Sequence, residues 1–155
     1  MDDFSFVTSS TRFKCQRCAK CCSLDVMLSD NEMKRLGGHA DEKWRTTKKV
    51  WRGATSRCIL LKDMSCAIYL SRPKLCRVYP FLAVLASDFS QLNIPCADSA
   101  LRITWEDGKS YFIIYDDACP GVGKGDVCDW NEEVALTVSH INDFAHSQAN
   151  PVKKD

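Results

Sequence analysis

Cysteine content constrains this chain more than any other feature. Ten of its 155 residues are cysteines. Such a density indicates either a disulfide framework in an oxidising compartment or thiolate ligation of metal in a reducing one. Four of the ten lie close together near the start: Cys15, Cys18, Cys21 and Cys22. The other six are spread over the rest of the chain: Cys58, Cys66, Cys76, Cys96, Cys119 and Cys128.

The N-terminal sequence favours the reducing compartment. Residues 1–6 open with acidic side chains and lack the basic and apolar regions of a secretory signal. The longest apolar run, Phe81 to Ala86, falls far short of the roughly 20 residues that span a bilayer. We therefore expect a soluble, cytoplasmic protein with no membrane insertion, whose thiols are reduced unless a metal holds them.

The size and charge of the chain are those of an ordinary globular domain. Lysine plus arginine (21) nearly balances aspartate plus glutamate (20), so the charge gives no reason to expect nucleic-acid binding. We predict a flexible arm over residues 1–12, a single cysteine-cluster metal-binding domain over residues 13–149 and a disordered tail over residues 150–155.

Local patterns predict several helices. Ser29 and Glu32 match a capping box, which starts a short helix ending near Leu36. Residues 41–52 are interpreted as a helix that buries Trp44 and Trp51 on one side. One or two helical turns should carry Cys76 between two prolines, and a C-terminal helix capped by Asp129 should end near His146.

Two β-hairpins complete the predicted fold. The apolar runs at residues 58–61 and 66–69 flank a turn at residues 62–65, and this hairpin would bring Cys58 close to Cys66. Residues 101–105 and 111–115 flank an Asp-Gly turn. The fold class expected is α+β: a small irregular domain, stapled by metal, with short β-hairpins and a C-terminal helix.

The strongest chemical signal is the C-x2-C-x2-C-C motif formed by residues 15–22. A tight loop can direct thiolates with this spacing at one centre, and both ferredoxin clusters and zinc knuckles use it. Neighbouring side chains point in different directions, so we expect Cys21 and Cys22 to serve different sites. In two-cluster ferredoxins the fourth cysteine of such a run likewise binds the other cluster.

Two four-ligand sites require eight thiolates. The strongest downstream candidates are Cys58, Cys66, Cys76 and Cys119, and the last is followed by Pro120, as is the last ligand in the bacterial ferredoxin run. That detail favours iron-sulfur over zinc. Cys96 and Cys128 are interpreted as buried free thiols.

Several motifs in order resemble the CxxCxxCC family of zinc- or iron-chelating cysteine-cluster domains. The matching segments are residues 13–22, Cys58, residues 66–69, residues 72–81 and residues 119–125. The resemblance implies a metal- or cluster-binding domain with eight cysteine ligands: Cys15, Cys18, Cys21, Cys22, Cys58, Cys66, Cys76 and Cys119. It implies little about biological role.

Residues around the motif have secondary interpretations. Arg72 and Arg77 flank Cys76 and either offset cluster charge or lie solvated at the surface. Tyr69 and Tyr79 are expected to cover the site. The glycines after Cys119 lack phosphate-loop spacing and are expected to let the backbone pass close to the metal.

The histidines and cysteines do not predict catalysis. His39, His140 and His146 lack ligand spacing and are interpreted as surface or core residues. No cysteine stands apart from the ligand set with a base beside it, and no thioredoxin-like pattern accompanies the C-x2-C pairs. We expect no enzymatic activity from this chain alone.

The sequence therefore predicts a protein holding two [4Fe-4S] clusters. It would act as a redox or oxygen-responsive accessory that docks on a larger protein complex. One alternative is a structural zinc-binding interaction module, and another is a maturation factor that delivers metal or a cluster to a client.

Overall fold

The computed structural model describes residues 4–24, 26–36, 57–91 and 98–149. The chain divides into two compact units, each described by itself. The first unit comprises residues 1–18 and 78–137, and the second comprises residues 19–77 and 138–155. The single domain expected over residues 13–149 stays a prediction. In the described ranges, no helix combines the length and apolar character needed to cross a membrane.

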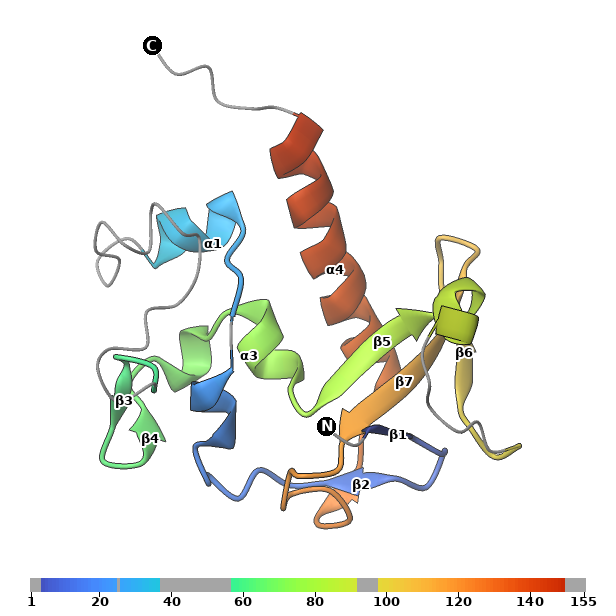
Figure 1. Cartoon of the computed structure of the whole chain (residues 1–155), viewed down its shortest axis with the longest axis horizontal. Helices are drawn as coiled ribbons and strands as arrows, with labels where there is room; N and C mark the ends of the chain where they lie inside the picture. The colour runs from blue at the N-terminus through green and yellow to red at the C-terminus, as the bar shows by residue number, and fades with distance from the viewer. Residues whose placement is uncertain (1–3, 25, 37–56, 92–97, 150–155) are drawn as a thin grey trace. The chain divides into compact units, whose positions relative to one another are not determined.

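An antiparallel sheet forms the centre of the first unit (Figure 1). Its long strand β7 (Ser110–Asp116) pairs with β5 (Phe81–Leu85) on one side. Strands β1 (Phe4–Phe6) and β6 (Arg102–Thr104) also pair with β7, at residues 114–116 and 110–112 respectively. The β6–β7 hairpin confirms the prediction from the Asp-Gly turn.

Strand β1 differs from the expected flexible arm. Phe4 to Phe6 pair with β7 in register, and Val7 is fully buried while its amide bonds to the carbonyl oxygen of Ile113. Burial of the apolar side chains of Phe6 and Val7 holds this segment against the sheet.

Short elements complete the first unit. A second, two-stranded sheet joins β2 (Arg12–Phe13) to β8 (Asp126–Val127), and the 3-10 helix η3 (Ala86–Gln91) follows β5. The ring of Phe81 makes edge contacts with Phe13, Tyr115 and Trp130, at centroid distances of 5.3, 6.4 and 5.0 Å. These aromatic contacts link the small sheet and the large sheet in one core.

The second unit consists of short helices and one small hairpin. The 3-10 helix η1 (Lys20–Ser23) precedes α1 (Asp30–Arg35), and η2 (Tyr69–Ser71) precedes α3 (Lys74–Val78). Strands β3 (Leu61–Lys62) and β4 (Ser65–Cys66) form the hairpin. Its turn residues, Asp63 and Met64, both have positive φ, as the twist of a two-residue hairpin turn requires.

Most of the predicted helices are confirmed. The capping box of α1 is present, with Ser29 and Glu32 each bonding the other's backbone amide. The short helix carrying Cys76 is α3, and the C-terminal helix α4 (Trp130–Ala149) ends three residues beyond the expected His146. The expected helix over residues 41–52 and the expected tail over residues 150–155 lie outside the described residues.

The described residues of the second unit share one apolar core cluster. Its buried members are Val26, Leu28, Leu36, Leu60 and Ile68. Partly buried Met33 and Leu75 pack against it, together with Cys58, Cys66 and Cys76. Short strands in small sheets with helices around them make the chain a small mixed α+β protein, as the sequence predicts.

Candidate metal centre

Five cysteines lie in the second unit, on three separate segments. The η1 turn carries the Cys21–Cys22 doublet, the hairpin region carries Cys58 and Cys66, and α3 carries Cys76. Ala19, in the left-handed conformation at φ 60°, starts the η1 turn. The amide of Cys58 donates to the carbonyl oxygen of Cys22 at 2.8 Å, which joins the first two segments.

The thiols of this group influence one another's ionisation. Burial raises the pKa of Cys22 to about 12, and the charges of Cys21, Cys58 and Cys66 add to the rise.

Cys58 and Cys76 behave in the same way. Burial raises the pKa of Cys58; the amide of Leu60 opposes this by donating to its sulfur at 3.4 Å, while the charges of Cys66 and Cys21 add to it. Burial also raises the pKa of Cys76, with further contributions from Cys21, Cys58 and Cys66. We call these five residues the thiol group: Cys21, Cys22, Cys58, Cys66 and Cys76.

The Cys21–Cys22 doublet lies wholly in the second unit, and the expectation that its members serve different sites stays a prediction. Both residues belong to the second unit, and their side chains share a hydrogen bond. The charge of Cys21 raises the pKa of Cys58, and the charge of Cys58 raises the pKa of Cys22. The rule that neighbouring side chains diverge holds for regular helices and strands. The tight η1 turn, entered through a left-handed residue, keeps both thiols with the same neighbours.

The thiol group lies against the unit's apolar core. Cys58, Cys66 and Cys76 pack on the buried cluster that includes Leu60 and Ile68. Backbone segments that carry these cysteines are therefore fixed by apolar packing, which limits how far their sulfur atoms can spread.

Arg72 is a cation held beside Cys76 by several contacts. Its guanidinium lies over the ring of Tyr69, 4.0 Å from the centroid, and donates to the carbonyl oxygens of Tyr69 (2.9 Å) and Cys76 (3.2 Å). Its charge favours the thiolate form of Cys76 against burial. Arg77, the other arginine singled out in the sequence, is exposed.

The first unit holds the other three predicted ligands: Cys15, Cys18 and Cys119. Burial raises the pKa of Cys119, and the charge of the nearby Cys18 adds to that rise. Cys15 is exposed, and the amide of Arg17 donates to its sulfur at 3.4 Å. Five of the eight predicted ligands thus lie in the second unit and three in the first.

Tyr79 lies beside the Cys18–Cys119 pair, as expected of a residue that covers the site. Burial raises the pKa of its phenol, and the charges of Asp116, Cys119 and Cys18 reinforce the effect. Its hydroxyl donates to Asp116 Oδ2 at 2.9 Å.

Asp116 is a residue that the sequence analysis missed. Its Oδ1 accepts from the amide of Ala118 at 2.8 Å, and its carbonyl oxygen accepts from the amide of Cys119 at 3.0 Å. These bonds build the turn that presents Cys119. The only sequence signal is an aspartate placed three residues before a Cys-Pro-Gly run, which is typical of a turn.

The glycines after Cys119 allow a close backbone approach. A Cβ on Gly121 would lie 2.6 Å from the carbonyl oxygen of Lys14, and one on Gly125 would lie 2.7 Å from that of Phe13. The Lys14 amide also donates to the Gly121 carbonyl oxygen at 3.1 Å. The approach is to the segment that leads into Cys15, so these glycines bring the Cys119 loop beside the start of the motif.

Residues outside the motifs stand apart. Cys128 is half-buried and free; burial raises its thiol pKa to about 11, and the charge of Glu133 adds to this. Burial lowers the pKa of the half-buried His140. Cys96, His39 and the side chain of His146 fall outside the described residues.

The donor set fits the metals that thiolates bind. Soft sulfur ligands select zinc and iron-sulfur clusters over magnesium or calcium. Among the described residues, no three His, Cys, Asp or Glu side chains already stand close enough to hold one metal ion.

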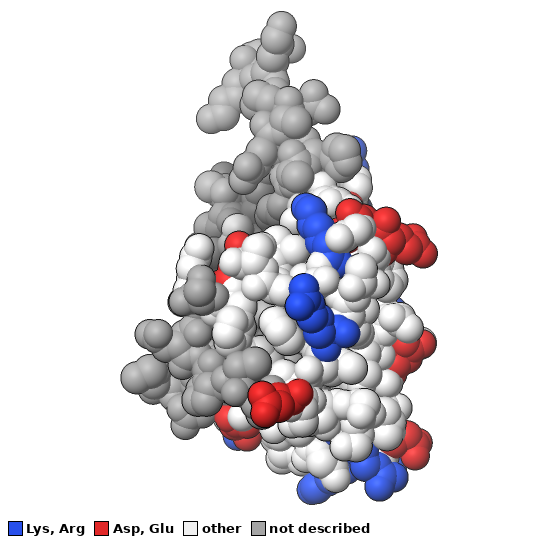
Figure 2. All heavy atoms as spheres, turned by 90° about the vertical axis from the view of Figure 1, so that its right-hand side faces the viewer, with Lys and Arg blue, Asp and Glu red and all other residues white. Residues whose placement is uncertain are grey.

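On the face seen in Figure 2, basic and acidic side chains are interspersed. The expected lack of nucleic-acid binding stays a prediction.

Comparison with known proteins gives one match. Residues 14–121 match the model of the CxxCxxCC family, whose description reads "Putative zinc- or iron-chelating domain". The matched range contains all eight predicted ligands. No curated protein and no solved structure matches the chain.

Proposed function

The chain belongs to the CxxCxxCC family of zinc- or iron-chelating domains, and from this premise we propose that its cysteines hold [4Fe-4S] clusters. The observation that carries the proposal is the thiol group of the second unit. Its members come from segments far apart in the sequence. Even so, the pKa of each of Cys22, Cys58 and Cys76 is raised in part by the charges of other members.

The deprotonated form of such a thiol group would be stabilised by a bound cation. Burial is the main cause of the raised pKa values of Cys22 and Cys58, and the charges of neighbouring thiolates add to it. A bound metal reverses the balance because it favours the deprotonated sulfur. The thiol group is therefore a ligand set from which four members would hold one cluster, and the cluster would supply one-electron redox chemistry.

Two features of the described residues suit a thiolate-bound cluster. Amides donate to the sulfur atoms of Cys58 and Cys15, and such bonds to cysteine sulfur tune cluster potentials. Arg72 adds a fixed positive charge beside Cys76, which would offset the negative charge of a thiolate-bound cluster.

The second cluster belongs to the first unit in this proposal. Cys15, Cys18 and Cys119 would bind it, with the Cys119 loop held beside the Cys15 segment by the close approach of Gly121 to Lys14. Three thiolates leave one position to a ligand from outside this set.

The biological role that follows is a redox or oxygen-responsive accessory of a larger protein complex, without catalysis of its own. Cys15 is exposed and Cys18 only half-buried, so a cluster there would lie within reach of oxygen or of a partner's redox centre. Among the described residues of the second unit, Leu70 is 95% exposed and Met64 is 51% exposed. Apolar side chains in the open are typical of contact surfaces.

A structural zinc module is the second candidate, and the packing of cysteines on the second unit's core favours it. Among the described residues, three of the thiol-group cysteines pack against the buried apolar cluster. Small cores are commonly completed by metal, and zinc held by four thiolates contributes folding free energy directly. A maturation factor that delivers metal would use the same ligands.

Anaerobic purification followed by iron, acid-labile sulfide and zinc analysis tests the proposal. We expect a brown protein with iron and sulfide in equal amounts. It should show a broad visible absorption that bleaches in air. A colourless protein with stoichiometric zinc and no sulfide would overturn the iron-sulfur assignment in favour of the zinc module. Cys128→Ser serves as the matched control, since Cys128 lies outside both ligand sets.

A further inference from the structure

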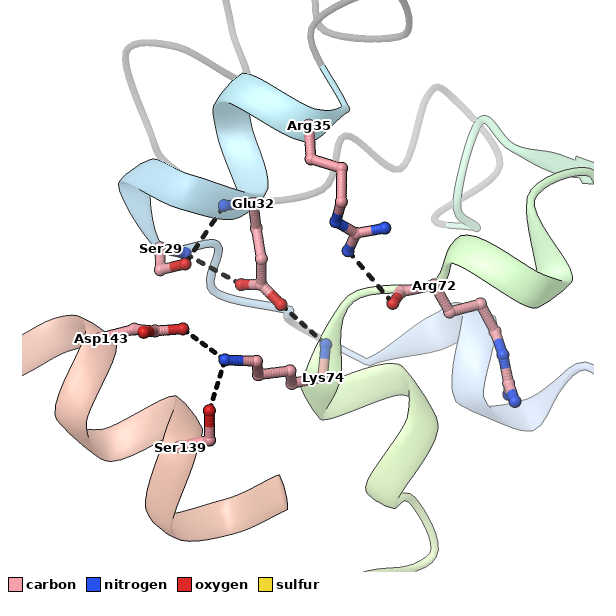
Figure 3. Close-up of polar contacts among 7 residues, drawn as sticks. All are labelled: Ser29, Glu32, Arg35, Arg72, Lys74, Ser139 and Asp143. Carbon is pink, nitrogen blue, oxygen red and sulfur yellow. Dashed lines mark hydrogen bonds and ion pairs between the residues drawn. The ribbon is translucent and has the colours of Figure 1, made fainter. Parts of the chain in front are cut away.

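Glu32 is a buried carboxylate that contacts the starts of two helices. Its side chain is in α1, and the residue is 3% exposed. One oxygen, Oε2, accepts from the amide of Ser29 at 3.0 Å and completes the capping box. The other, Oε1, accepts from the amide of Lys74 at 2.7 Å, at the first residue of α3 (Figure 3).

The second contact supplies α3 with a cap that it lacks locally. The first amides of a helix have no intrahelical acceptor, and the helix dipole favours negative charge there. The first turn of α3 has no acidic residue of its own. Glu32 provides both the acceptor and the charge from a helix 42 positions away in the sequence.

The side chain of Lys74 fixes the same point from another direction. Its ammonium donates to Ser139 Oγ and to Asp143 Oδ2, each at 2.6 Å, which ties α3 to α4 within the second unit. Figure 3 shows Lys74 held in this way, with its amide on Glu32 and its ammonium on the helix that carries Ser139 and Asp143.

The segment before α3 is also attached to α1. The guanidinium of Arg35 donates to the carbonyl oxygens of Ser71 (2.5 Å) and Arg72 (3.3 Å). Helix α1 therefore holds both the approach to α3 and its first turn. Cys76, a member of the thiol group, lies two residues after Lys74.

We infer that Glu32 is a positioning residue of the metal centre, which fixes the backbone of α3 so that Cys76 faces the rest of the thiol group. It does not bind the metal, since both its oxygens are engaged by amides. The inference rests on the proposed function only in that the thiol group is taken as a ligand set.

The test uses the full chain with its native metal and two variants. Glu32→Gln keeps one acceptor oxygen and loses the other together with the charge, so one of the two amides loses its partner. Ser29→Ala is the matched control, because it weakens the same capping box but leaves the contact between Glu32 and Lys74 in place. Both variants should lower the thermal midpoint.

Metal release to a competing chelator separates positioning from stability. Supporting residues of metal sites typically change affinity by about 10- to 100-fold. We expect Glu32→Gln to release metal at least about tenfold faster than the wild type, while Ser29→Ala releases it at the wild-type rate. Equal release from the two variants would overturn the inference.

A metal-free measurement keeps this inference separate from the proposed function. Alkylation of Cys76 in the reduced, metal-free protein, followed by peptide mass analysis, should be faster in Glu32→Gln than in Ser29→Ala. An unchanged rate at Cys76 would overturn the inference even if metal is bound. A wild-type protein that binds neither iron nor zinc would overturn the proposed function, whatever the alkylation result.

Discussion

The amide of Cys58 donates a hydrogen bond to the carbonyl oxygen of Cys22 at 2.8 Å. This bond joins the end of the C-x2-C-x2-C-C motif to the start of the hairpin region through the backbone, so it does not depend on the state of either thiol. Changes to the sulfur atoms can therefore be tested without removing the contact that brings the two segments together.

Replacing Cys58 by serine should remove metal from the second unit. The substitution keeps the backbone bond to Cys22 and removes one sulfur from the thiol group. With one site in each unit, we expect the purified variant to contain roughly half of the wild-type metal, measured by elemental analysis. Cys128→Ser should keep the full amount. A Cys58→Ser protein with unchanged metal content would show that the other four thiols of the group hold the metal without Cys58.

The raised thiol pKa values predict how stability depends on pH. Cys22 has a pKa of about 12 in the folded protein against an ordinary value of 9.0, so between these values the metal-free fold binds more protons than the unfolded chain. Its contribution is fully present below about pH 9 and is lost as the pH rises toward 12. We therefore expect the thermal midpoint of the metal-free, reduced protein to fall above about pH 9.

The metal-loaded protein should not lose stability in this way as the pH rises. Binding requires deprotonated sulfur, so the affinity for metal rises with pH and bound metal offsets the loss of stability. Thermal unfolding of both forms between about pH 7 and 10 checks the difference. Parallel curves for the two forms would contradict the assignment of these thiols as ligands.

Local sequence patterns predicted the parts of the fold that depend on neighbouring residues. The capping box of Ser29 and Glu32 and the Asp-Gly turn before β7 both act within a few positions, and both are confirmed. Strand β1 escaped because three residues are too few for a periodic pattern, and its place is set by pairing with β7.

The candidate site was predictable in its residue types and less so in its grouping. Thiolate spacing indicated the candidate ligands, but the η1 turn that carries Cys21 and Cys22 starts at the left-handed Ala19, which spacing does not reveal. The contact of Glu32 with Lys74 was equally hidden, because a capping box accounts for that glutamate completely at the level of sequence.

A methyl group on Gly121 should disturb the first unit's site. A Cβ there would meet the Lys14 carbonyl oxygen at 2.6 Å and the Phe13 ring at 2.7 Å, so the Cys119 loop must move away from the Cys15 segment. We expect Gly121→Ala to lower the free energy of unfolding by about 1–3 kcal/mol, measured by denaturant titration. The variant should also lose metal from the first unit.

Gly123→Ala is the control for this substitution. A Cβ on Gly123 meets nothing within 4 Å, but its φ of +84° makes any side chain strained. The variant should lose about 1 kcal/mol through backbone strain and keep its metal. Equal metal loss in both variants would show that loop strain, not the close approach to Lys14, governs the site.

Removal of the Arg72 charge should make the cluster in the second unit harder to reduce. The guanidinium is anchored on the Tyr69 ring and on two carbonyl oxygens, so its charge is fixed beside Cys76. Reduction adds negative charge, which a nearby cation stabilises. We expect Arg72→Gln to lower the reduction potential by tens of millivolts in a redox titration of the cluster-loaded protein.

Arg77→Gln removes an exposed cation of the same segment and should leave the potential nearly unchanged, because solvent screens it. An equal decrease in both variants would mean that net charge, not the anchored guanidinium, sets the potential.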